Sequence, residues 1–450
     1  MPTFSSPFAE NNLKPTAYQG AILHSIGKGA DDIAYYPDGL LLVNARGQID
    51  ACGDRLQLSP QIDLSVYTLE VLSEDQVLMP GMIDLHTHLP QYHVRGKQEK
   101  DLLSWLGRHI FPEEAKFSDP AYAKSVSDDF FKALLQNGTT TACVFLTSHR
   151  DATDIAFESA QAIGNRVVMG LNLMDTPSVP DAYVSNASEL SLLRQSQELL
   201  LDTEALCRKW HGRQDGRLRY AWMPRFALSC TETLLSATGD LRAKYPDVYF
   251  HTHLSEQPGE VEAVLRRFPW ASDYTEVYDK FDLLGSHSIL AHGVHLSDSE
   301  LELLKKTQSG LAHCPGSNFF LKSGRFPLAR VMEKNLRFGL GSDVGAGPEL
   351  SIFKAMRDAQ YRQDGGSCPL PLNSLFYAAT LGAARVLHLE ATLGNFLPGK
   401  WADFIVLHVP LAVSGPIVSS NDILSAAVYL LDERHIIKSA VSGKVLYQRG

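Results

Sequence analysis

The sequence predicts an α/β fold: a (β/α)₈ TIM-like barrel with a small β-sandwich domain made from the N- and C-terminal segments. Eight short apolar segments alternate with segments of helical period, and together they have the length of such a barrel. Histidines, carboxylates and an arginine stand at the ends of several apolar segments, where α/β barrels carry their functional residues. Both ends of the chain are short apolar runs broken by glycine, aspartate and proline, which is typical of strands.

The central part of the chain supplies the predicted barrel strands. They are LMPGMIDLH (78–86), TTTACVFL (139–146), RVVMGLNLM (166–174), LRYAWMPRFALS (218–229), YFHTHLSE (249–256), SILAHGVHL (288–296), SGLAHCPGS (309–317) and RFGLGSDV (337–344). Between the first two, residues 119–138 have apolar positions at helical spacing, with Gly138 just past the end. An open doubly wound sheet is the alternative, but the glycine fingerprint expected after its first strand is absent.

The predicted organisation has three parts along the chain. Residues 1–79 form the N-terminal part of the sandwich, with strands in AILHSIG (21–27) and GLLLVNARGQI (39–49). Residues 80–392 form the barrel. Residues 393–450 complete the sandwich, with strands in GKWADFIVLHV and AVSGKVLYQRG. The two ends are therefore expected to pair with each other.

Composition narrows the class of partner. The chain has 450 residues and a formal net charge of −10, with no long Lys/Arg cluster, so a nucleic-acid partner is not expected. The absence of a signal-like N-terminus and of a long apolar run predicts a cytoplasmic protein without a membrane span. The cysteines are scattered without a CxxC pair, which argues for a reducing compartment and against a thiolate zinc site: Cys52, Cys143, Cys207, Cys230, Cys314 and Cys368.

His86 and His88 stand two apart at the end of the first predicted strand. Side chains two apart on a strand share a face, so the two imidazoles could grip one cation. An isolated HxH pair is more often one capping and one solvated histidine. Here His253, His292 and Asp343 end other strands, and strand ends converge at one rim of a barrel. The convergence predicts a metal site.

This nitrogen- and oxygen-rich set, without sulfur, suits Zn²⁺ or Fe²⁺ with an open position for water. A divalent cation lowers the pKa of bound water toward about 7, which provides hydroxide at neutral pH. Glu256 lies three residues beyond His253 and is placed to act as a general acid and base. The HxE at residues 388–390 has no PCxxC after it, which excludes the cysteine-ligated deaminase design.

The chain resembles the amidohydrolase superfamily of metal-dependent hydrolases, and within it the members that deaminate guanine. The resemblance rests on PGMIDLHTHLPQY (80–92), LLSWLGRHIFPEE (102–114), NGTTTACVF (137–145), MPRFALSC (223–230), HTHLSE (251–256), AHGVHLS (291–297), AHCPGSN (312–318), GLGSDVGAG (339–347), ATLGAARVLHL (379–389) and GNFLPGKWADF (394–404). HxH and the last aspartate are common to the superfamily. The LLSWL…FP element, Gln91 and the PRF triplet are narrower and point to guanine.

The resemblance implies a role for each site residue. One zinc ion per subunit, or Fe²⁺ as the alternative, would be held by four ligands: His86, His88, His253 and Asp343. Gln91 and Arg225 would bind the purine edge that carries O6 and N7, and Phe226 would contact the base. The substrate would also meet His88, His253, Glu256 and Asp343. Glu256 would shuttle protons, Asp343 would take the proton of water, and His292 would orient the water or stabilise the intermediate. Related sites with two metals use a lysine on the fourth strand; Arg225 there predicts one metal.

The predicted reaction is hydrolysis of guanine to xanthine and ammonia, in purine catabolism or salvage, by a homodimer that the resemblance implies. Another heterocycle, such as 8-oxoguanine, a pterin or a triazine, is the closest alternative, because His93, Val94 and Arg95 make the first loop bulkier and more basic than expected. A non-catalytic scaffold is the alternative of a different class. Trp105 and Phe111 are either a lid over the base or core residues.

Overall fold

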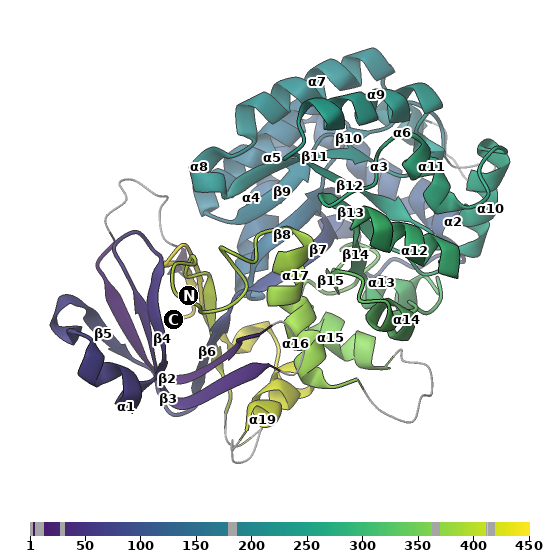
Figure 1. Cartoon of the computed structure of the whole chain (residues 1–450). Coiled ribbons are helices and arrows are strands. Elements are labelled where there is room, and N and C mark those ends of the chain that lie inside the picture. Colours follow the sequence, from purple (N-terminus) through teal and green to yellow (C-terminus); the bar gives the residue numbers. More distant parts are fainter. Residues whose placement is uncertain are drawn as a thin grey trace.

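The computed structural model describes residues 3–4, 13–27, 32–178, 187–361, 370–410, 412 and 419–450. A barrel of eight parallel strands forms its larger part (Figure 1). The barrel strands are β7 (Met82–His88), β8 (Thr139–Phe145), β9 (Arg166–Gly170), β11 (Leu218–Pro224), β12 (Tyr249–Leu254), β13 (Ser288–His292), β14 (Gly310–His313) and β15 (Phe338–Leu340). A two-residue strand, β10 (Asn172–Leu173), also pairs with β11. The predicted fold class is confirmed.

Two backbone hydrogen bonds join the last barrel strand to the first, just beyond the end of β15. The Asp343 N–H donates to His86 O at 2.8 Å, and the His88 N–H donates to Val344 O at 2.8 Å. Backbone hydrogen bonds therefore join the two predicted metal-binding segments. They bring the chain after β15 against β7 and so close the barrel.

Each predicted barrel strand overlaps an observed one, but the bounds predicted for the first are wrong. LMPGMIDLH is not one strand: β6 (Gln76–Pro80) ends before Gly81 and belongs to a different sheet from β7. A Cβ at Gly81 would lie 2.1 Å from Oγ1 of Thr140, so only glycine fits where the chain crosses between the sheets. The chain passes from one sheet to the other at Pro80-Gly81. The apolar residues on both sides of this pair made the two strands look like one.

Helices cover the outside of the barrel. They are α4 (Pro120–Gln136), α5 (Arg150–Ile163), α6 (Ala187–Leu192), α7 (Ser196–Trp210), α8 (Arg213–Gly216), α9 (Glu232–Lys244), α10 (Pro258–Arg267), α11 (Tyr274–Lys280), α12 (Asp298–Thr307), α13 (Pro315–Phe320), α14 (Leu328–Glu333), α15 (Ile352–Tyr361), α16 (Leu372–Ala379) and α17 (Leu381–Val386). The predicted helix over 119–138 is α4. Asp119 caps it by accepting from the Ala121 N–H at 2.9 Å, and Gly138 follows its end with φ +80°.

The two ends of the chain share one mixed sheet at the other end of the molecule, where Figure 1 also places both termini. Its strands run in the order β1, β18, β17, β16, β6, β2, β3, β4, with β5 paired to β2. Besides β6 they are β1 (Thr3–Phe4), β2 (Thr16–Ser25), β3 (Ile33–Val43), β4 (Ile49–Asp54), β5 (Thr68–Val71), β16 (Phe404–His408), β17 (Ile436–Val441) and β18 (Lys444–Gln448). Short helices α1 (Arg55–Leu58) and α19 (Ser420–Ser425) accompany it.

A buried ion pair ties this terminal sheet to the barrel. Arg166, at the start of β9, donates from Nε to Oδ2 of Asp403 at 2.9 Å and from Nη2 to Oδ1 at 3.2 Å. Asp403 also accepts from the Ser442 N–H at 2.7 Å, and its carbonyl accepts from the Gly81 N–H at 3.0 Å. Both charged side chains are buried, so each depends on the other for its opposite charge.

Asp403→Ala is expected to lower the free energy of unfolding by about 3–5 kcal/mol, because it leaves the Arg166 guanidinium buried without its anion. Denaturant unfolding followed by circular dichroism measures the change. Asp298→Ala, which removes an exposed partner of Arg330, is the control and should change stability by less than about 1 kcal/mol. Equal losses in the two variants would contradict the assignment.

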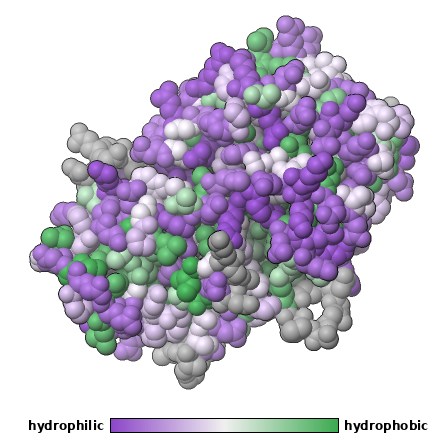
Figure 2. All heavy atoms as spheres, in the orientation of Figure 1, coloured by the Kyte–Doolittle hydropathy of each residue, from purple (hydrophilic) through white to green (hydrophobic). Residues whose placement is uncertain are grey.

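Among the described residues, no helix combines the length and apolar character needed to cross a bilayer. The described cysteines are all free thiols, and Cys368 lies outside the described residues. On the face drawn in Figure 2, the helices of the barrel present a mostly hydrophilic surface, whereas hydrophobic residues gather over the terminal sheet. Leu56, Leu69 and Val71, from α1 and β5, are among the exposed apolar side chains there.

Candidate active site and metal centre

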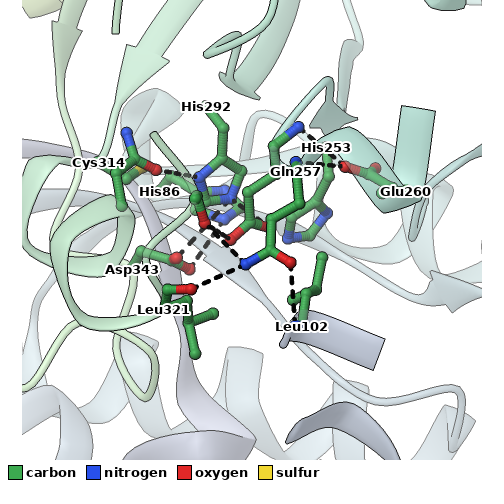
Figure 3. Close-up of polar contacts among 12 residues, drawn as sticks. His86, Leu102, His253, Gln257, Glu260, His292, Cys314, Leu321 and Asp343 are labelled. Atoms are coloured by element: carbon green, nitrogen blue, oxygen red, sulfur yellow. Dashed lines mark hydrogen bonds and ion pairs between the residues drawn. The ribbon is translucent and has the colours of Figure 1, made fainter. Parts of the chain in front are cut away.

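Three imidazoles and one carboxylate converge at the carboxyl end of the barrel (Figure 3). One ligand atom from each of His86, His88, His253 and Asp343 lies within 4.8 Å of the other three. Oδ1 of Asp343 is 3.2 Å from Nε2 of His86 and 3.3 Å from Nε2 of His88. The Nε2 atoms of His88 and His253 are 3.2 Å apart. The structure thus brings together all four residues predicted as ligands.

The far sides of two of these rings are fixed by the protein. Nδ1 of His253 donates to the backbone oxygen of Arg225 at 2.6 Å, so Nε2 presents a lone pair to the cluster. Nδ1 of His86 lies 2.9 Å from Nε2 of His251, which gives His251 a place directly behind a candidate ligand. Burial lowers the pKa of His86 to about 3 and the pKa of His253 well below its ordinary value. Neutral imidazoles with inward lone pairs are what a metal ligand requires.

The chain bends sharply where it leaves β13 and β15. His292 has φ +71° and Asp343 has φ +49°, a left-handed conformation that costs a non-glycine residue about 1–3 kcal/mol. Beside them, a Cβ at Gly341 would lie 3.0 Å from both Cβ of His86 and Sγ of Cys314. The bends therefore occur at the residues whose side chains meet at the site. Asp343 lies three residues past the observed end of β15, not on the strand itself.

Glu256 and His292 stand beside the cluster. Oε1 of Glu256 accepts from Oγ of Ser323 at 3.2 Å, and Oε2 lies 3.5 Å from Nε2 of His292. Nδ1 of His292 is 3.1 Å from Oδ1 of Asn318. Burial raises the pKa of Glu256 to about 7, against the opposing effect of His292. Burial would lower the pKa of His292, but the carboxylates of Glu256 and Asp343 outweigh it and raise that pKa.

The side chains predicted to bind a substrate edge are buried near the ligand cluster. Arg225 follows β11 directly and is buried, with Nη1 2.5 Å from Oε2 of Glu114. Gln91 lies in the 3₁₀ helix that follows β7 (Leu89–Val94) and donates from Nε2 to Oε1 of Glu114 at 3.1 Å. Phe226 is buried, and its ring centroid is 6.5 Å from that of His253. All three side chains are buried, and Arg225 forms an ion pair at the carboxyl end of the barrel.

A cavity that opens to solvent lies among these groups, and its empty space, with the adjoining solvent included, is about 390 Å³. Its apolar wall comes from the loop after β7, through α2 (Leu102–Trp105) and Leu106, and from Leu321 after α13. Its polar wall is formed by eight side chains: His88, Gln91, Arg225, His253, Glu256, Glu260, His292 and Asp343. Trp105 therefore lines the cavity, whereas Phe111 is buried in the core with its ring 5.2 Å from Cζ of Arg225. Of the two aromatic residues left open as lid or core, Trp105 faces the cavity.

Residues 77–446 match the sequence profile of the Amidohydrolase family. The chain belongs to that family. A guanine deaminase of Escherichia coli K12 is 35% identical to this amidohydrolase over 425 residues, which is 93% of each chain. The solved structure of the E. coli guanine deaminase superposes with a TM-score of 0.88 at 33% identity, covering 97% of this chain and 100% of that one. A C. acetobutylicum guanine deaminase solved with guanine bound gives a TM-score of 0.85 at 29% identity, covering 96% and 100%.

Sequence reasoning about this amidohydrolase missed a second set of polar residues. Glu260 accepts from the N–H of Glu256 at 2.8 Å and from the Tyr274 hydroxyl at 3.0 Å, which fixes the backbone of Glu256. Gln257 accepts from the Leu102 N–H at 3.1 Å and donates to Leu321 O at 3.0 Å, joining the two loops of the apolar wall (Figure 3). The signal for Glu260 was its spacing, four residues after Glu256 at the start of a helix.

The first-loop residues that departed from the expected pattern do not reach the cavity of the amidohydrolase. His93 is exposed and its ring packs beside Tyr92. Arg95 is exposed, with its guanidinium 4.2 Å from the centre of the Tyr92 ring. Val94 is buried in the hydrophobic core. Within the described residues, these three side chains are not among those that line the cavity.

The four converging groups fit one divalent cation, because three neutral imidazoles and a carboxylate form a common zinc or iron ligand set. His88→Ala is expected to lower the metal content of purified protein several-fold from about one ion per chain. His93→Ala, which changes an exposed histidine in the same loop, is the control and should keep the metal. Elemental mass spectrometry measures both; an unchanged metal content in His88→Ala would contradict the site.

Proposed function

We propose that this amidohydrolase is a guanine deaminase that hydrolyses guanine to xanthine and ammonia. The observation that carries the proposal is the cavity itself, which is lined by three of the four candidate ligands, by Glu256, and by Gln91 and Arg225. The named guanine deaminases that match nearly the whole chain support it. A non-catalytic scaffold would not need to bury these polar side chains together, as this site does with all of them except the half-buried His253.

The reaction needs a nucleophile at C2 of the purine, a proton for the adjacent ring nitrogen, and a proton for departing ammonia. A cation held by His86, His88, His253 and Asp343 supplies a Lewis acid that activates water at neutral pH. We assign the proton transfers to Glu256, whose carboxyl lines the cavity and whose backbone is held by Glu260. With a pKa of about 7, this carboxyl can both take and give a proton near neutrality.

His292 and Asp343 are assigned to the same half of the cavity as Glu256. Nε2 of His292 lies 3.7 Å from Oδ2 of Asp343 and 3.5 Å from Oε2 of Glu256, so one imidazole faces both carboxylates. We assign to it the orientation of the attacking water. Asp343, which also belongs to the ligand set, accepts the proton that the water loses.

We assign the recognition of guanine to Arg225, Gln91 and Phe226. The guanidinium of Arg225 and the amide of Gln91 can donate to O6 and N7, and both are purine acceptors on one side of the ring. Phe226 borders the base. A purine with an amino group at C6 would present a donor to these donors, which leaves buried groups unpaired and disfavours it.

We propose zinc as the metal, with one ion per subunit, in a cytoplasmic homodimer that acts in purine catabolism or salvage. The nitrogen-rich ligand set supports zinc, with Fe²⁺ as the alternative. The free thiols support a reducing compartment. The homodimer rests on the family resemblance, and light scattering of the purified protein tests it.

Ammonia release by the zinc-loaded protein tests the substrate assignment. Guanine is compared with adenine, cytosine, 8-oxoguanine, a pterin and a triazine at equal concentrations. We expect guanine to have the highest kcat/KM of the panel. A higher value for another heterocycle would keep the hydrolytic chemistry and overturn guanine as the substrate.

A further inference from the structure

Glu114 lies behind both groups assigned to the purine edge. It is in α3 (Phe111–Ala115) and its side chain is fully buried. One carboxylate oxygen, Oε1, accepts from Nε2 of Gln91 at 3.1 Å, and the other, Oε2, accepts from Nη1 of Arg225 at 2.5 Å. Glu114 is not among the residues that line the cavity, so it acts on a ligand only through these two side chains.

The carboxylate of Glu114 fixes the orientation of the Gln91 amide, that is, the positions of its oxygen and its NH₂ group. Oε1 of Gln91 accepts from the Gly345 N–H at 3.2 Å, while Nε2 donates to the carboxylate of Glu114. Turning the amide over would place its oxygen against a carboxylate oxygen and its NH₂ against an N–H group. Because a carboxylate can only accept and a backbone N–H can only donate, the flipped state is doubly disfavoured. One amide hydrogen of Nε2 is left to donate to a ligand, and Oε1 keeps a second lone pair beside the Gly345 N–H.

Arg225 is held in the same way. Its guanidinium uses Nη1 to bind Glu114, and Phe111 from the same helix lies under it, with 5.2 Å from Cζ to the ring centre. A guanidinium has only donors, so its remaining N–H groups are donors as well. The carboxylate also supplies the negative charge that a buried guanidinium needs.

We propose that Glu114 is the positioning residue that sets substrate specificity, by holding both Gln91 and Arg225 so that each presents an N–H donor to the purine edge. Such an edge selects purines with an oxygen at C6 over purines with an amino group there. The inference rests on the proposed function, because it concerns the same purine edge. In this proposal, the selectivity between an oxygen and an amino group at C6 depends on a residue that does not contact the substrate.

The variant Glu114→Gln tests this directly. The replacement amide offers one acceptor where the carboxylate offers two, so either Gln91 or Arg225 loses its partner and gains freedom to turn. Guanine is compared with 2,6-diaminopurine, which keeps the C2 amine and carries an amino group at C6. Both are measured as substrates by ammonia release and, where turnover is absent, the second is measured as a competitive inhibitor of guanine. Melting temperature and metal content are recorded for every variant.

Glu113→Gln is the matched control. Glu113 is the neighbouring glutamate of the same helix and is also buried, but its carboxylate binds Lys116 at 2.6 Å and the Tyr122 hydroxyl. It contacts neither Gln91 nor Arg225 in the described structure. The control should keep the wild-type preference between the two purines.

In Glu114→Gln we expect kcat/KM for guanine to fall about 10- to 100-fold, and the preference for guanine over 2,6-diaminopurine to fall at least about 10-fold. A purely structural role would lower both purines in parallel and leave the preference unchanged, which would overturn the proposal. If Glu114→Gln does not fold, Glu114→Asp, which keeps the charge but withdraws the carboxylate, is judged by the same ratio. A wild-type protein that does not deaminate guanine would instead refute the proposed function.

Discussion

Glu256→Gln is expected to lower kcat for guanine by about 10²- to 10⁴-fold, the range that a positioned proton-transfer group contributes. The replacement amide keeps the size of the side chain and can still meet Ser323 and His292, which lie 3.2 and 3.5 Å from the present carboxylate oxygens. What it loses is the ability to exchange a proton. The loss should therefore fall on kcat, with smaller changes in KM and in metal content.

The control for this variant is Glu262→Gln, six residues further on, where the side chain is 73% exposed on α10. Its kcat should equal that of the wild type. Steady-state ammonia release measures kcat, and elemental mass spectrometry measures the metal. A Glu256→Gln protein with full metal and an undiminished kcat would remove Glu256 from the proton path.

Arg225→Ala is expected to lower kcat/KM for guanine by about 100-fold or more. The change removes the donors assigned to the purine edge and also leaves Glu114 buried without its cation. Because the second effect acts on folding, kcat/KM is to be expressed per folded and metal-loaded molecule. Arg225→Lys keeps the charge but not the planar fork of donors, so it should restore stability better than activity.

Arg219→Ala is the control for Arg225→Ala, because Arg219 lies on β11 and donates to the backbone oxygen of Gly216, away from the cavity. It should leave kcat/KM within a factor of about 2, as is usual for a change away from special features. A wild-type kcat/KM for guanine in Arg225→Ala would contradict the recognition that we assign.

The ligand cluster could be predicted because it follows from the two-residue period of a strand and from the convergence of strand ends in a barrel. His86 and His88 share a face of one strand, and a barrel brings the ends of its parallel strands to one rim. His253 and His292 then follow from their places at the ends of other strands, and Asp343 from its place shortly after the last one. The sequence could not show that β15 stops at Leu340 and that the chain turns through a left-handed Asp343 to reach the site. That bend depends on contacts with β7, which is far away in the chain.

The residues that hold the site in place could not be predicted in the same way. Glu114 meets Gln91 only because the loop after β7 folds through a 3₁₀ helix, α2 and a π-helix (Leu106–Ile110) before α3. No repeat of hydrophobic residues encodes that path. The same 3₁₀ helix buries Gln91 and Val94, three positions apart, and leaves His93 exposed between them. For this reason the departure around His93, which left substrate preference open, does not alter the lining of the cavity.

The most direct test of hydrolytic deamination is to convert guanine with the metal-loaded protein in water labelled with heavy oxygen. Mass spectrometry follows the purine product, and an ammonia assay follows the amine. Hydrolytic deamination predicts xanthine that carries one labelled oxygen, formed in equal amount to ammonia, because water replaces the amine at C2. Absence of xanthine, or xanthine without the label, would contradict hydrolytic deamination of guanine at this site.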